Sequence, residues 1–443
     1  MRAVLREPLP WRDPARLALA LAQTWGPEGL LWLDGDGSAL GRWGTLSADP
    51  LEQHCCRGLP GEPEARDPFA VLRQLQPGHW SGWLSYEAGA WVEPGSHWKP
   101  DAMASLWLAR HDPVLRFDLQ AQQLWLEGTD PERNAAWAAL VHATPGAGAS
   151  ETAVEALAVG ARLGLDGWHW HTSRGEFAEG VEQIRAWIAA GDLFQANLTA
   201  CCERQLPQGT EVLPLFLRLR QRCPAPFAAL VIGAGEASGE ALLSASPERF
   251  LEAQPSGLVE TRPIKGTRPR HRDRQRDAAA AADLVCSPKD RAENVMIVDL
   301  LRNDLGRVCQ PGTIAVPQLV GLESYPQVHH LTSVITGQLR PEHSWVDLLR
   351  ACWPGGSISG APKVRACQRL AQLEPVARGP YCGSLLRIDW NGRCDSSILI
   401  RTLLLQGRRL RAHAGCGIVA DSDPNAEAEE LGWKIQPLLE SLA

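Results

Sequence analysis

The stretch Thr261-Arg262-Pro263-Ile264-Lys265-Gly266-Thr267 closes a predicted strand over residues 258–264 and carries one of only five lysines among the 44 basic residues of the chain. A guanidinium stays protonated in proteins, so a chain this biased toward arginine is expected to keep lysine where chemistry needs a neutral amine. The alternative is that individual lysines merely escaped the bias. Because Pro263 and Gly266 restrict or shape the backbone on both sides of Lys265, this lysine is the first candidate for a catalytic residue.

The surrounding pattern predicts an α+β fold with a mostly antiparallel sheet. A capping box at Ser173 and Glu176 opens a predicted amphipathic helix that ends at Gly191, and further helices are predicted to begin at 287–288, Ser344 and Pro424. Strand-like runs lie at residues 192–199, 241–250, 258–264, 329–339, 384–390 and 398–405. These strands and helices do not alternate regularly, which argues against a doubly wound parallel sheet.

Composition limits the class of protein. The chain has 443 residues, of which 44% are hydrophobic and 21% charged, as in a soluble protein of two or three domains. The net charge of -7 argues against a general nucleic-acid or membrane-surface partner. No signal peptide or membrane-spanning run is evident, and the twelve cysteines contain no C-x-x-C pair, so we expect reduced thiols in a cytoplasmic protein.

Two groups of carboxylates fall on predicted helices. Glu293 shares a helix face with apolar residues, so its charge needs a compensating cation or proton, and an ion pair with Lys289 is the open alternative. Glu427, Glu430 and Lys434 share a face of the helix that opens at Pro424. With Glu293 they could hold Mg²⁺, although such spacing is also typical of a solvated helix face.

Other motifs are weaker. The glycines and serines of residues 354–363 precede a predicted helix over 364–373 and could bind a carboxylate or phosphate, or form a plain turn. Gly415-Cys416-Gly417 lacks the third glycine of a dinucleotide site. The arginine-rich run 268–277 is interleaved with aspartates and has no aromatic residue, which favours a solvated loop or helix start over a nucleic-acid patch.

Taken in order, these motifs resemble the chorismate-utilising enzymes, and within them the aminodeoxychorismate synthases. The match lies between Ser173 and Lys434, in segments 191–198, 246–250, 263–267, 290–294, 299–304, 329–331, 354–363, 381–384, 400–402 and 415–422. A looser match lies at 40–43, 48–50 and 82–86. The resemblance implies a layered antiparallel β-sandwich core flanked by helices. It also implies an amino-terminal region over 1–145, a connecting segment over 146–172 and a chorismate-binding catalytic domain over 173–443.

Two positions separate the reactions of this family. Anthranilate synthases usually carry alanine where this chain has Lys265, and isochorismate and salicylate synthases place a water-activating lysine where it has Gln195. The resemblance therefore implies that ammonia is added to chorismate to give 4-amino-4-deoxychorismate, for para-aminobenzoate and folate synthesis. The alternative is an anthranilate synthase component I that carries a lysine. A non-catalytic binder of small anions is disfavoured because Glu248, Lys265, Glu293 and Glu430 occur together.

The implied mechanism requires pKa shifts of opposite direction in two residues. Neutral Lys265 attacks ring carbon 2 while the hydroxyl at carbon 4 leaves, protonated by Glu248, and ammonia then enters at carbon 4 and expels the lysine. A free lysine is almost wholly ammonium at neutral pH, so the pKa of Lys265 must be lowered and that of Glu248 raised.

The resemblance also implies the binding residues. Glu293 and Glu430 are expected to hold Mg²⁺ against the ring carboxylate, with Glu427 nearby and with Gly266 and Thr267 touching that end. The remaining substrate-binding residues are His330, Tyr381, Arg401, Gly415, Cys416 and Gly417. Lys363 matches a family motif without a defined role.

One expected feature of the family is missing and one partner is implied. Many relatives bind tryptophan in the amino-terminal region, but the corresponding segments here are Leu33-Asp34-Gly35 and Pro224-Ala225-Pro226-Phe227, so tryptophan binding is not expected. No pattern of a glutaminase or a pyridoxal-phosphate lyase domain is found. The implied partner is a separate glutamine amidotransferase subunit, component II, that supplies the ammonia.

Overall fold

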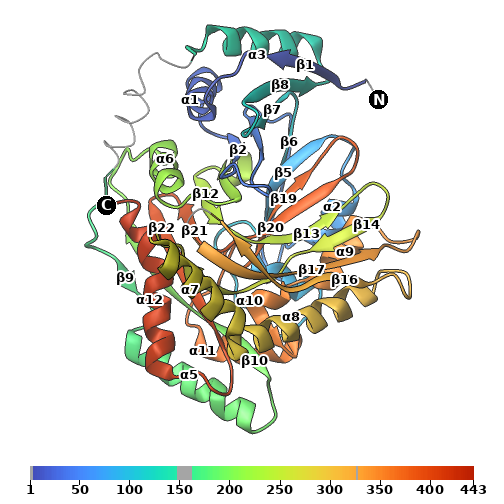
Figure 1. The fold of residues 1–443 in the computed structure, drawn as a ribbon. Coiled ribbons are helices and arrows are strands. Elements are labelled where there is room, and N and C mark those ends of the chain that lie inside the picture. The colour runs from blue at the N-terminus through green and yellow to red at the C-terminus, as the bar shows by residue number, and fades with distance from the viewer. Residues whose placement is uncertain (1–2, 147–161, 326–327) are drawn as a thin grey trace.

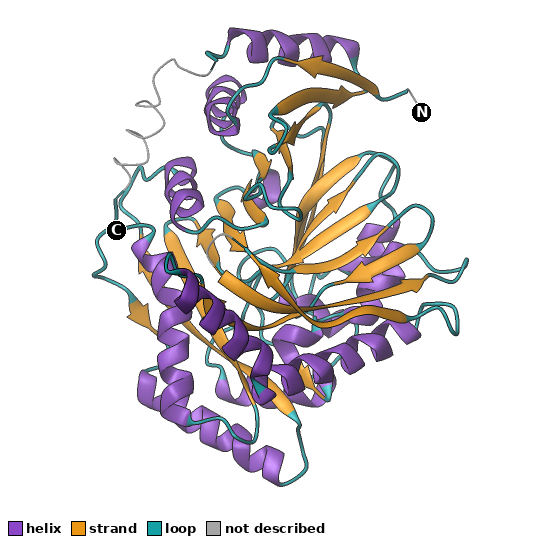
Figure 2. Cartoon of the chain, viewed as in Figure 1, coloured by secondary structure: helices purple, strands orange, loops and turns teal. Residues whose placement is uncertain are grey.

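The computed structural model describes residues 3–146, 162–325 and 328–443. Two sheets form the core, and helices pack against them (Figures 1 and 2). Every strand pair among the described residues is antiparallel, which confirms the predicted α+β class.

The first sheet has twelve strands, which come from both the amino-terminal and the carboxyl-terminal parts of the chain. Its order is β1 (Leu5–Leu9), β8 (Gln123–Gly128), β7 (Val114–Asp118), β3 (Trp43–Ser47), β2 (Leu31–Leu33), β11 (Phe227–Ile232), β12 (Glu240–Ser246), β21 (Thr402–Gln406), β22 (Arg409–Ile418), β10 (Gln195–Gln205) and β18 (Gly360–Ala361), with β9 (His169–Trp170) also paired to β10.

The second sheet has ten strands. Its order is β15 (Ile264–Pro269), β17 (Val328–Gln338), β14 (Leu258–Thr261), β13 (Arg249–Ala253), β20 (Cys394–Ile398), β19 (Ser384–Ile388), β5 (His79–Leu84), β6 (Leu106–His111) and β4 (Glu52–Cys56), with β16 (Ala315–Ser324) also paired to β17.

The α-helices and 3₁₀-helices connect these strands. They are α1 (Pro14–Trp25), α2 (Pro68–Arg73), η1 (Tyr86–Trp91), α3 (Pro131–Ala143), α5 (Arg174–Ala189), α6 (Val212–Arg222), η2 (Gly235–Ala237), α7 (Arg274–Cys286), α8 (Pro288–Gly306), α9 (Trp345–Cys352), α10 (Gly356–Ser359), α11 (Lys363–Leu373) and α12 (Pro424–Glu440).

Strand β11 shows how the apolar residues build two cores. Successive side chains of a strand point to opposite faces of the sheet. Ala229 and Val231 accordingly belong to one buried cluster, which the second sheet, α8 and α9 also line. Leu230 and Ile232 belong to the other cluster, together with residues of α1, α5, α6 and α12. The first sheet is therefore buried on both faces at its centre.

Several predicted elements are confirmed and some boundaries are wrong. The capping box of Ser173 and Glu176 is present at the start of α5, and α8, α9, α11 and α12 begin close to where they are expected. The strand predicted over 192–199 begins only at Gln195, because a turn follows α5. The strand predicted over 241–250 is two strands, β12 and β13, which are separated by Pro247 and Glu248.

The strand predicted over 258–264 is also two strands, β14 and β15, which lie end to end along β17. Thr261 is opposite Ile335 and Ile264 is opposite Thr332, so the register runs on unchanged across the break. Pro263 lies in the break, and its missing N–H removes a ladder hydrogen bond there. The prediction of one continuous strand over 258–264 was therefore wrong, although residues 258–261 and 264 do lie in strands.

A third boundary differs at Arg401. The strand predicted over 398–405 starts only at Thr402, and Ile398 ends the preceding strand β20. Arg401 has a φ of 50°, a left-handed conformation that interrupts a strand. Arg401 is exposed and lies in the segment that connects β20 of the second sheet to β21 of the first.

Both sheets contain strands from each side of the predicted boundary at residues 146–172. Strands β1, β2, β3, β7 and β8 lie in the first sheet, and β4, β5 and β6 in the second. Most of the predicted connecting segment, residues 147–161, lies outside the described residues. The division into domains stays a prediction.

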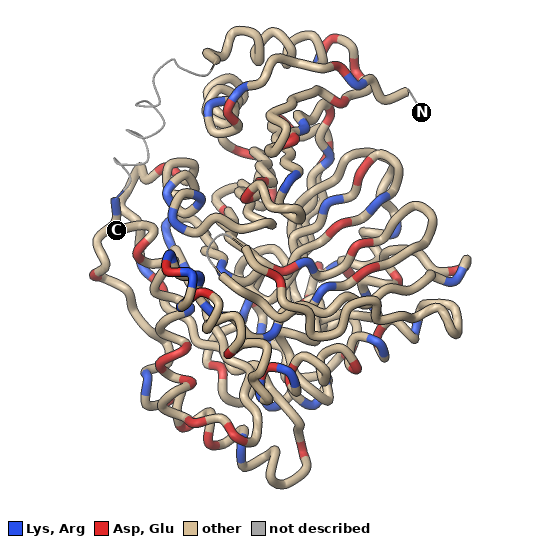
Figure 3. Tube along the Cα trace, in the orientation of Figure 1, with Lys and Arg blue, Asp and Glu red and all other residues tan. Residues whose placement is uncertain are grey.

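Three further properties concern the cysteines, the apolar length of the helices and the distribution of charge. None of the twelve cysteines forms a disulfide, and all except Cys223 and Cys286 are buried. No helix in the described part of the chain is long and apolar enough to cross a membrane. Acidic and basic residues are interspersed along the trace (Figure 3). In the arginine-rich run, Arg268 pairs with Asp283 and Arg270 with Asp277.

Candidate active site

Lys265 lies on β15, where the pairing with β17 changes register. Lys265 is opposite Leu331 but Thr267 is opposite His330, so Gly266 is one extra residue, a β-bulge. Gly266 has a φ of 78°, which favours glycine. Bulges are frequent beside active sites because they re-aim side chains.

Gly266 is also required by packing. A Cβ added there would lie 2.8 Å from Cδ1 of Leu284 and 2.9 Å from Cβ of Asp290, because α7 and α8 pack on β15. We therefore expect Gly266→Ala to lower the free energy of unfolding by about 2 kcal/mol or more, from backbone strain plus overpacking.

The matched control for this prediction is Gly312→Ala. Gly312 has a φ of 79° but nothing within 4 Å of an added Cβ, so it isolates the cost of the backbone conformation. We expect that cost to be about 1 kcal/mol. Chemical denaturation measures both variants, and equal losses would show that the contact with α7 and α8 adds nothing.

Glu248 lies between β12 and β13, and only 5% of its surface is exposed. Ser357, at the start of α10, joins this carboxyl to Lys265. Its side chain hydrogen-bonds Glu248, and its carbonyl oxygen accepts a hydrogen bond from Nζ of Lys265 at 3.3 Å. The predicted catalytic pair is therefore brought together by a residue of the loop at 354–363.

The environment shifts the pKa values of Glu248 and Lys265 in the directions that the implied mechanism requires. Burial raises the pKa of Glu248 to about 7, although Ser357 and Lys265 oppose the shift. Burial lowers the pKa of Lys265, although the negative charges of Glu293, Glu248 and Glu430 oppose it. Each group is thus moved toward the neutral form.

Gln195 lies beside the amine of Lys265. A Cβ added to Gly417 would lie 2.5 Å from Nε2 of Gln195 and 3.5 Å from Nζ of Lys265, so the two side chains meet over this glycine. Oε1 of Gln195 is buried and has no hydrogen-bond partner among the described residues. Gly417 therefore admits both side chains because it has none of its own.

Helices α8 and α12 bring the predicted metal-binding carboxylates toward Lys265 from two sides. The ligand atoms of Glu427, Glu430 and Cys416 lie within 4.8 Å of one another. Glu293 is partly buried, and its carboxylate makes no ion pair or hydrogen bond with any described residue. Burial raises its pKa, while the charges of Lys265 and Lys289 lower it.

The ion pair considered for Lys289 forms with a different partner. Its Nζ lies 3.1 Å from Oε1 of Glu427, across α8 and α12, rather than against Glu293 on its own helix. The same oxygen accepts a hydrogen bond from Ser422 at 2.7 Å. One oxygen of Glu427 is therefore already engaged, whereas both oxygens of Glu293 are open to a ligand.

Arg401 and His330 line a cavity of about 210 Å³ next to Pro247. The guanidinium of Arg401 has no carboxylate partner among the described residues, which suits an anionic ligand. Burial lowers the pKa of His330 to about 4, so the ring is neutral at physiological pH. Its Nδ1 lies 2.8 Å from Oγ1 of Thr267, beside the bulge.

The other predicted residues lie on neighbouring strands or loops. Tyr381 is buried and stacks on His413, with ring centroids 4.9 Å apart. Gly415, Cys416 and Gly417 lie on β22, and the carbonyl of Gly415 accepts a hydrogen bond from Lys434 at 2.9 Å. Lys363 has a structural role, because its Nζ lies 2.6 Å from Asp304 and binds the carbonyl of Cys352.

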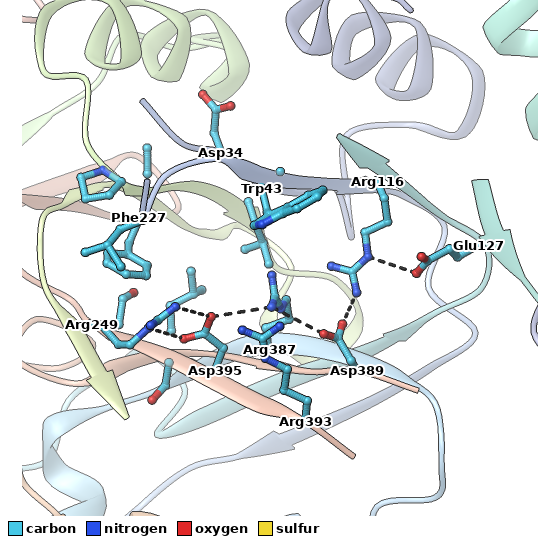
Figure 4. Close-up of a pocket in the computed structure, with 18 of the residues that line it drawn as sticks. Asp34, Trp43, Arg116, Glu127, Phe227, Arg249, Arg387, Asp389, Arg393 and Asp395 are labelled. Carbon is cyan, nitrogen blue, oxygen red and sulfur yellow. Dashed lines mark hydrogen bonds and ion pairs between the residues drawn. The ribbon is translucent and has the colours of Figure 1, made fainter. Parts of the chain in front are cut away.

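A larger cavity of about 430 Å³ lies between the sheets and includes neither Lys265 nor Glu248 (Figure 4). It is lined by the segments at Leu33-Asp34 and Pro226-Phe227. Figure 4 shows a network in which Arg116 pairs with Glu127 and Asp389. The prediction that tryptophan is not bound here stays a prediction.

Residues 23–440 match the family model of the chorismate binding enzymes. The chain therefore belongs to this family of enzymes, as the resemblance implied. It is 45% identical over 275 residues to aminodeoxychorismate synthase component 1 of Salmonella typhimurium, and the aligned stretch covers 62% of this chain and 59% of that protein. It is 38% identical over 407 residues to aminodeoxychorismate synthase component 1 of Klebsiella aerogenes, which covers 90% of this chain and 84% of that protein.

The fold agrees with a solved relative. The crystal structure of anthranilate synthase component I from Streptococcus pneumoniae superposes with a TM-score of 0.74 at 26% identity. The superposition covers 90% of this chain and 92% of that one. The layered fold implied by the resemblance is confirmed.

Sequence reasoning missed Ser357 and Arg378. In the sequence Ser357 is one residue of a glycine- and serine-rich loop, and its contacts with Glu248 and Lys265 depend on the tertiary fold. Arg378 is hidden among many arginines, and no local motif distinguishes it. It is nevertheless among the largest fully buried side chains of the described residues.

Proposed function

We propose that this chain is the chorismate-aminating component of an aminodeoxychorismate synthase, which converts chorismate and ammonia to 4-amino-4-deoxychorismate. The observation that carries the proposal is the pair Lys265 and Glu248, joined through Ser357, with burial favouring the neutral form of each. The identity of 38% to 45% with relatives of that name supports it.

In the proposed reaction, the lone pair of Lys265 forms a bond to carbon 2 of the ring as both conjugated ring double bonds shift by one position and the carbon 4–oxygen bond breaks. Glu248 gives its proton to the departing hydroxyl, which leaves as water. Ammonia then forms a bond at carbon 4, the two double bonds shift back, and the electron pair of the lysine bond returns to Lys265. The ammonium formed at carbon 4 gives a proton back to the Glu248 carboxylate. A nucleophile and an acid placed in one pocket suit this exchange.

The two carboxylates of chorismate need cationic or N–H partners. Arg401 is proposed for the enolpyruvyl carboxylate, together with Tyr381 and the backbone of residues 415–417, because its guanidinium has no acid partner. Gly266, Thr267 and His330 are proposed to face the ring carboxylate. An arginine can bind a carboxylate through two parallel hydrogen bonds.

Mg²⁺ is the proposed cofactor, and the residues present fit it. Glu293 and Glu430 are the proposed ligands, because carboxylate oxygens are the hard ligands that Mg²⁺ prefers. Glu430 lies in one group with Glu427 and Cys416, whereas Glu293 lies outside that group, on α8. The thiol of Cys416 is unsuited to Mg²⁺, and burial raises its pKa to about 12. When bound, the ion would neutralise the ring carboxylate and orient the substrate.

Glu430→Gln tests this ligand set. The amide keeps the shape of the side chain but removes a negative ligand, so we expect the Mg²⁺ concentration for half-maximal activity to rise about 10-fold or more. Glu429→Gln is the control, because Glu429 is exposed and pairs with Arg174. An unchanged magnesium titration in Glu430→Gln would remove this residue from the site.

The ammonia is proposed to come from a glutamine amidotransferase subunit. The relatives are named as component 1, which supports a second component. Cytoplasmic location remains a proposal.

Product identification by mass spectrometry separates the proposed function from its alternative. The purified chain, given chorismate, ammonium and Mg²⁺, should form 4-amino-4-deoxychorismate. The likeness to anthranilate synthase component I favours anthranilate as the second candidate product. Anthranilate as the main product, or no consumption of chorismate, would overturn the proposal.

A further inference from the structure

Arg378 lies in the turn between α11 and β19, and only 1% of its surface is exposed. Glu374 holds the guanidinium through two hydrogen bonds, from Nε at 2.9 Å and from Nη2 at 2.7 Å. A buried charge is tolerated when it is paired in this way. The remaining N–H groups of Arg378 can therefore bind backbone carbonyls.

Two such carbonyls belong to the segments that flank Lys265. Nη1 of Arg378 donates to the carbonyl of Ile358 at 2.8 Å, and Nη2 donates to the carbonyl of Asn197 at 2.7 Å. Ile358 directly follows Ser357, whose own carbonyl accepts from the Lys265 amine. Asn197 follows Gln195 by two residues on β10. One guanidinium therefore binds both the Ser357 segment and the Gln195 strand.

The backbone at Arg378 is held independently of its side chain. Oε1 of Glu87 accepts hydrogen bonds from the N–H groups of Arg378 at 2.9 Å and Gly379 at 3.1 Å. The amide of Tyr86 donates to the carbonyl of Gly379 at 2.9 Å. A change of the Arg378 side chain therefore leaves these anchors of the turn in place.

We propose that Arg378 is a positioning residue that aligns the Ser357 carbonyl and the Gln195 strand on the Lys265 amine, an inference that rests on the proposed function. The planar guanidinium presents its N–H groups in a rigid fork and so reaches Glu374, Ile358 and Asn197 at once. An ammonium at this position keeps the charge but cannot span the three acceptors.

Arg378→Lys in the full chain tests the alignment. We expect kcat to fall about 10- to 100-fold while the KM for chorismate changes less than threefold, because small misplacements cost turnover. Arg116→Lys is the control, since Arg116 also pairs with carboxylates but lies in the wall of the larger cavity. Equal kcat values for the two variants, or a loss of kcat that matches the loss of folded protein, would overturn the inference.

A second readout does not depend on turnover. The hydrogen bond to the Ser357 carbonyl favours the ammonium form of Lys265, so its loss in Arg378→Lys should lower the pKa of the amine. When the rate of acylation of Lys265 is followed by peptide mapping, the pH of half-maximal acylation should therefore fall by about 1 pH unit. Arg116→Lys should leave that midpoint unchanged. A midpoint unchanged in folded Arg378→Lys overturns the positioning role, whatever the wild-type product.

The positioning role of Arg378 and the proposed function can be tested separately. A shifted midpoint together with no amination of chorismate by the wild type supports the alignment and overturns the proposed function alone. If Arg378→Lys does not fold, Glu374→Gln replaces it, because the amide still accepts from Arg378 and from the amide of Thr199 but holds the guanidinium less tightly. The same shift is expected, and its absence overturns the inference.

Discussion

Lys265→Arg is expected to lower the formation of 4-amino-4-deoxychorismate by more than about 10⁴-fold, the scale of losing a covalent nucleophile. The substituted guanidinium stays protonated and has no lone pair to attack carbon 2. Burial lowers the pKa of the native amine, a shift that arginine cannot use. Product formation over time, measured by chromatography, checks the result.

The control for this variant is binding rather than turnover. Arginine keeps a long side chain with N–H donors at this position, so titration calorimetry with chorismate should give an affinity within about tenfold of the wild type. Thermal unfolding reports whether the larger side chain is accommodated beside Gly417 and Ser357. Activity close to that of the wild type in a folded Lys265→Arg chain would end the nucleophile assignment.

Glu248→Gln is expected to lower kcat by about 10²- to 10⁴-fold, because the amide cannot protonate the departing hydroxyl. Burial raises the pKa of Glu248 to about 7, so the wild-type pH profile should contain an ionisation near pH 7. The carboxyl is protonated below that pH and loses its proton above it. The residual activity of Glu248→Gln, measured from pH 5.5 to 9, should lack this ionisation.

Glu252→Gln is the matched control for this change. Glu252 is also buried and follows Glu248 in the chain, but it pairs with Arg249 and Arg393 outside the site. Its kcat should stay within about threefold of the wild type, since it touches none of the reacting groups. An ionisation near pH 7 that persists in Glu248→Gln would assign that pKa to another group.

Much of the fold was predictable from local pattern. The capping box at Ser173 and the prolines that open α8 and α12 mark helix starts through local chemistry, so these elements are placed well. The break at Pro263 has a local cause, the missing N–H of proline, whereas the boundary at Arg401 depends on a left-handed conformation that the sequence does not mark. Register and backbone strain are set by tertiary contacts.

The candidate site divides in the same way. Lys265 stands out in the sequence because lysine is rare in this chain, and the family motifs imply Glu248 and Glu430. The ion pair of Lys289 with Glu427 joins two helices distant in the sequence, so helical spacing, which offered Glu293 as one alternative, could not identify this partner. The two contacts by which Arg378 reaches the site are to backbone carbonyls, which carry no sequence signal.

The central claim is that Lys265 bonds covalently to the substrate, and mass spectrometry of the enzyme tests it most directly. With chorismate and Mg²⁺ but no ammonia, rapid quenching and peptide mapping should find Lys265 carrying one chorismate less one water. Added ammonium should remove the adduct as 4-amino-4-deoxychorismate forms. The account is contradicted if Lys265 stays unmodified without ammonia while the same enzyme preparation converts chorismate once ammonium is added.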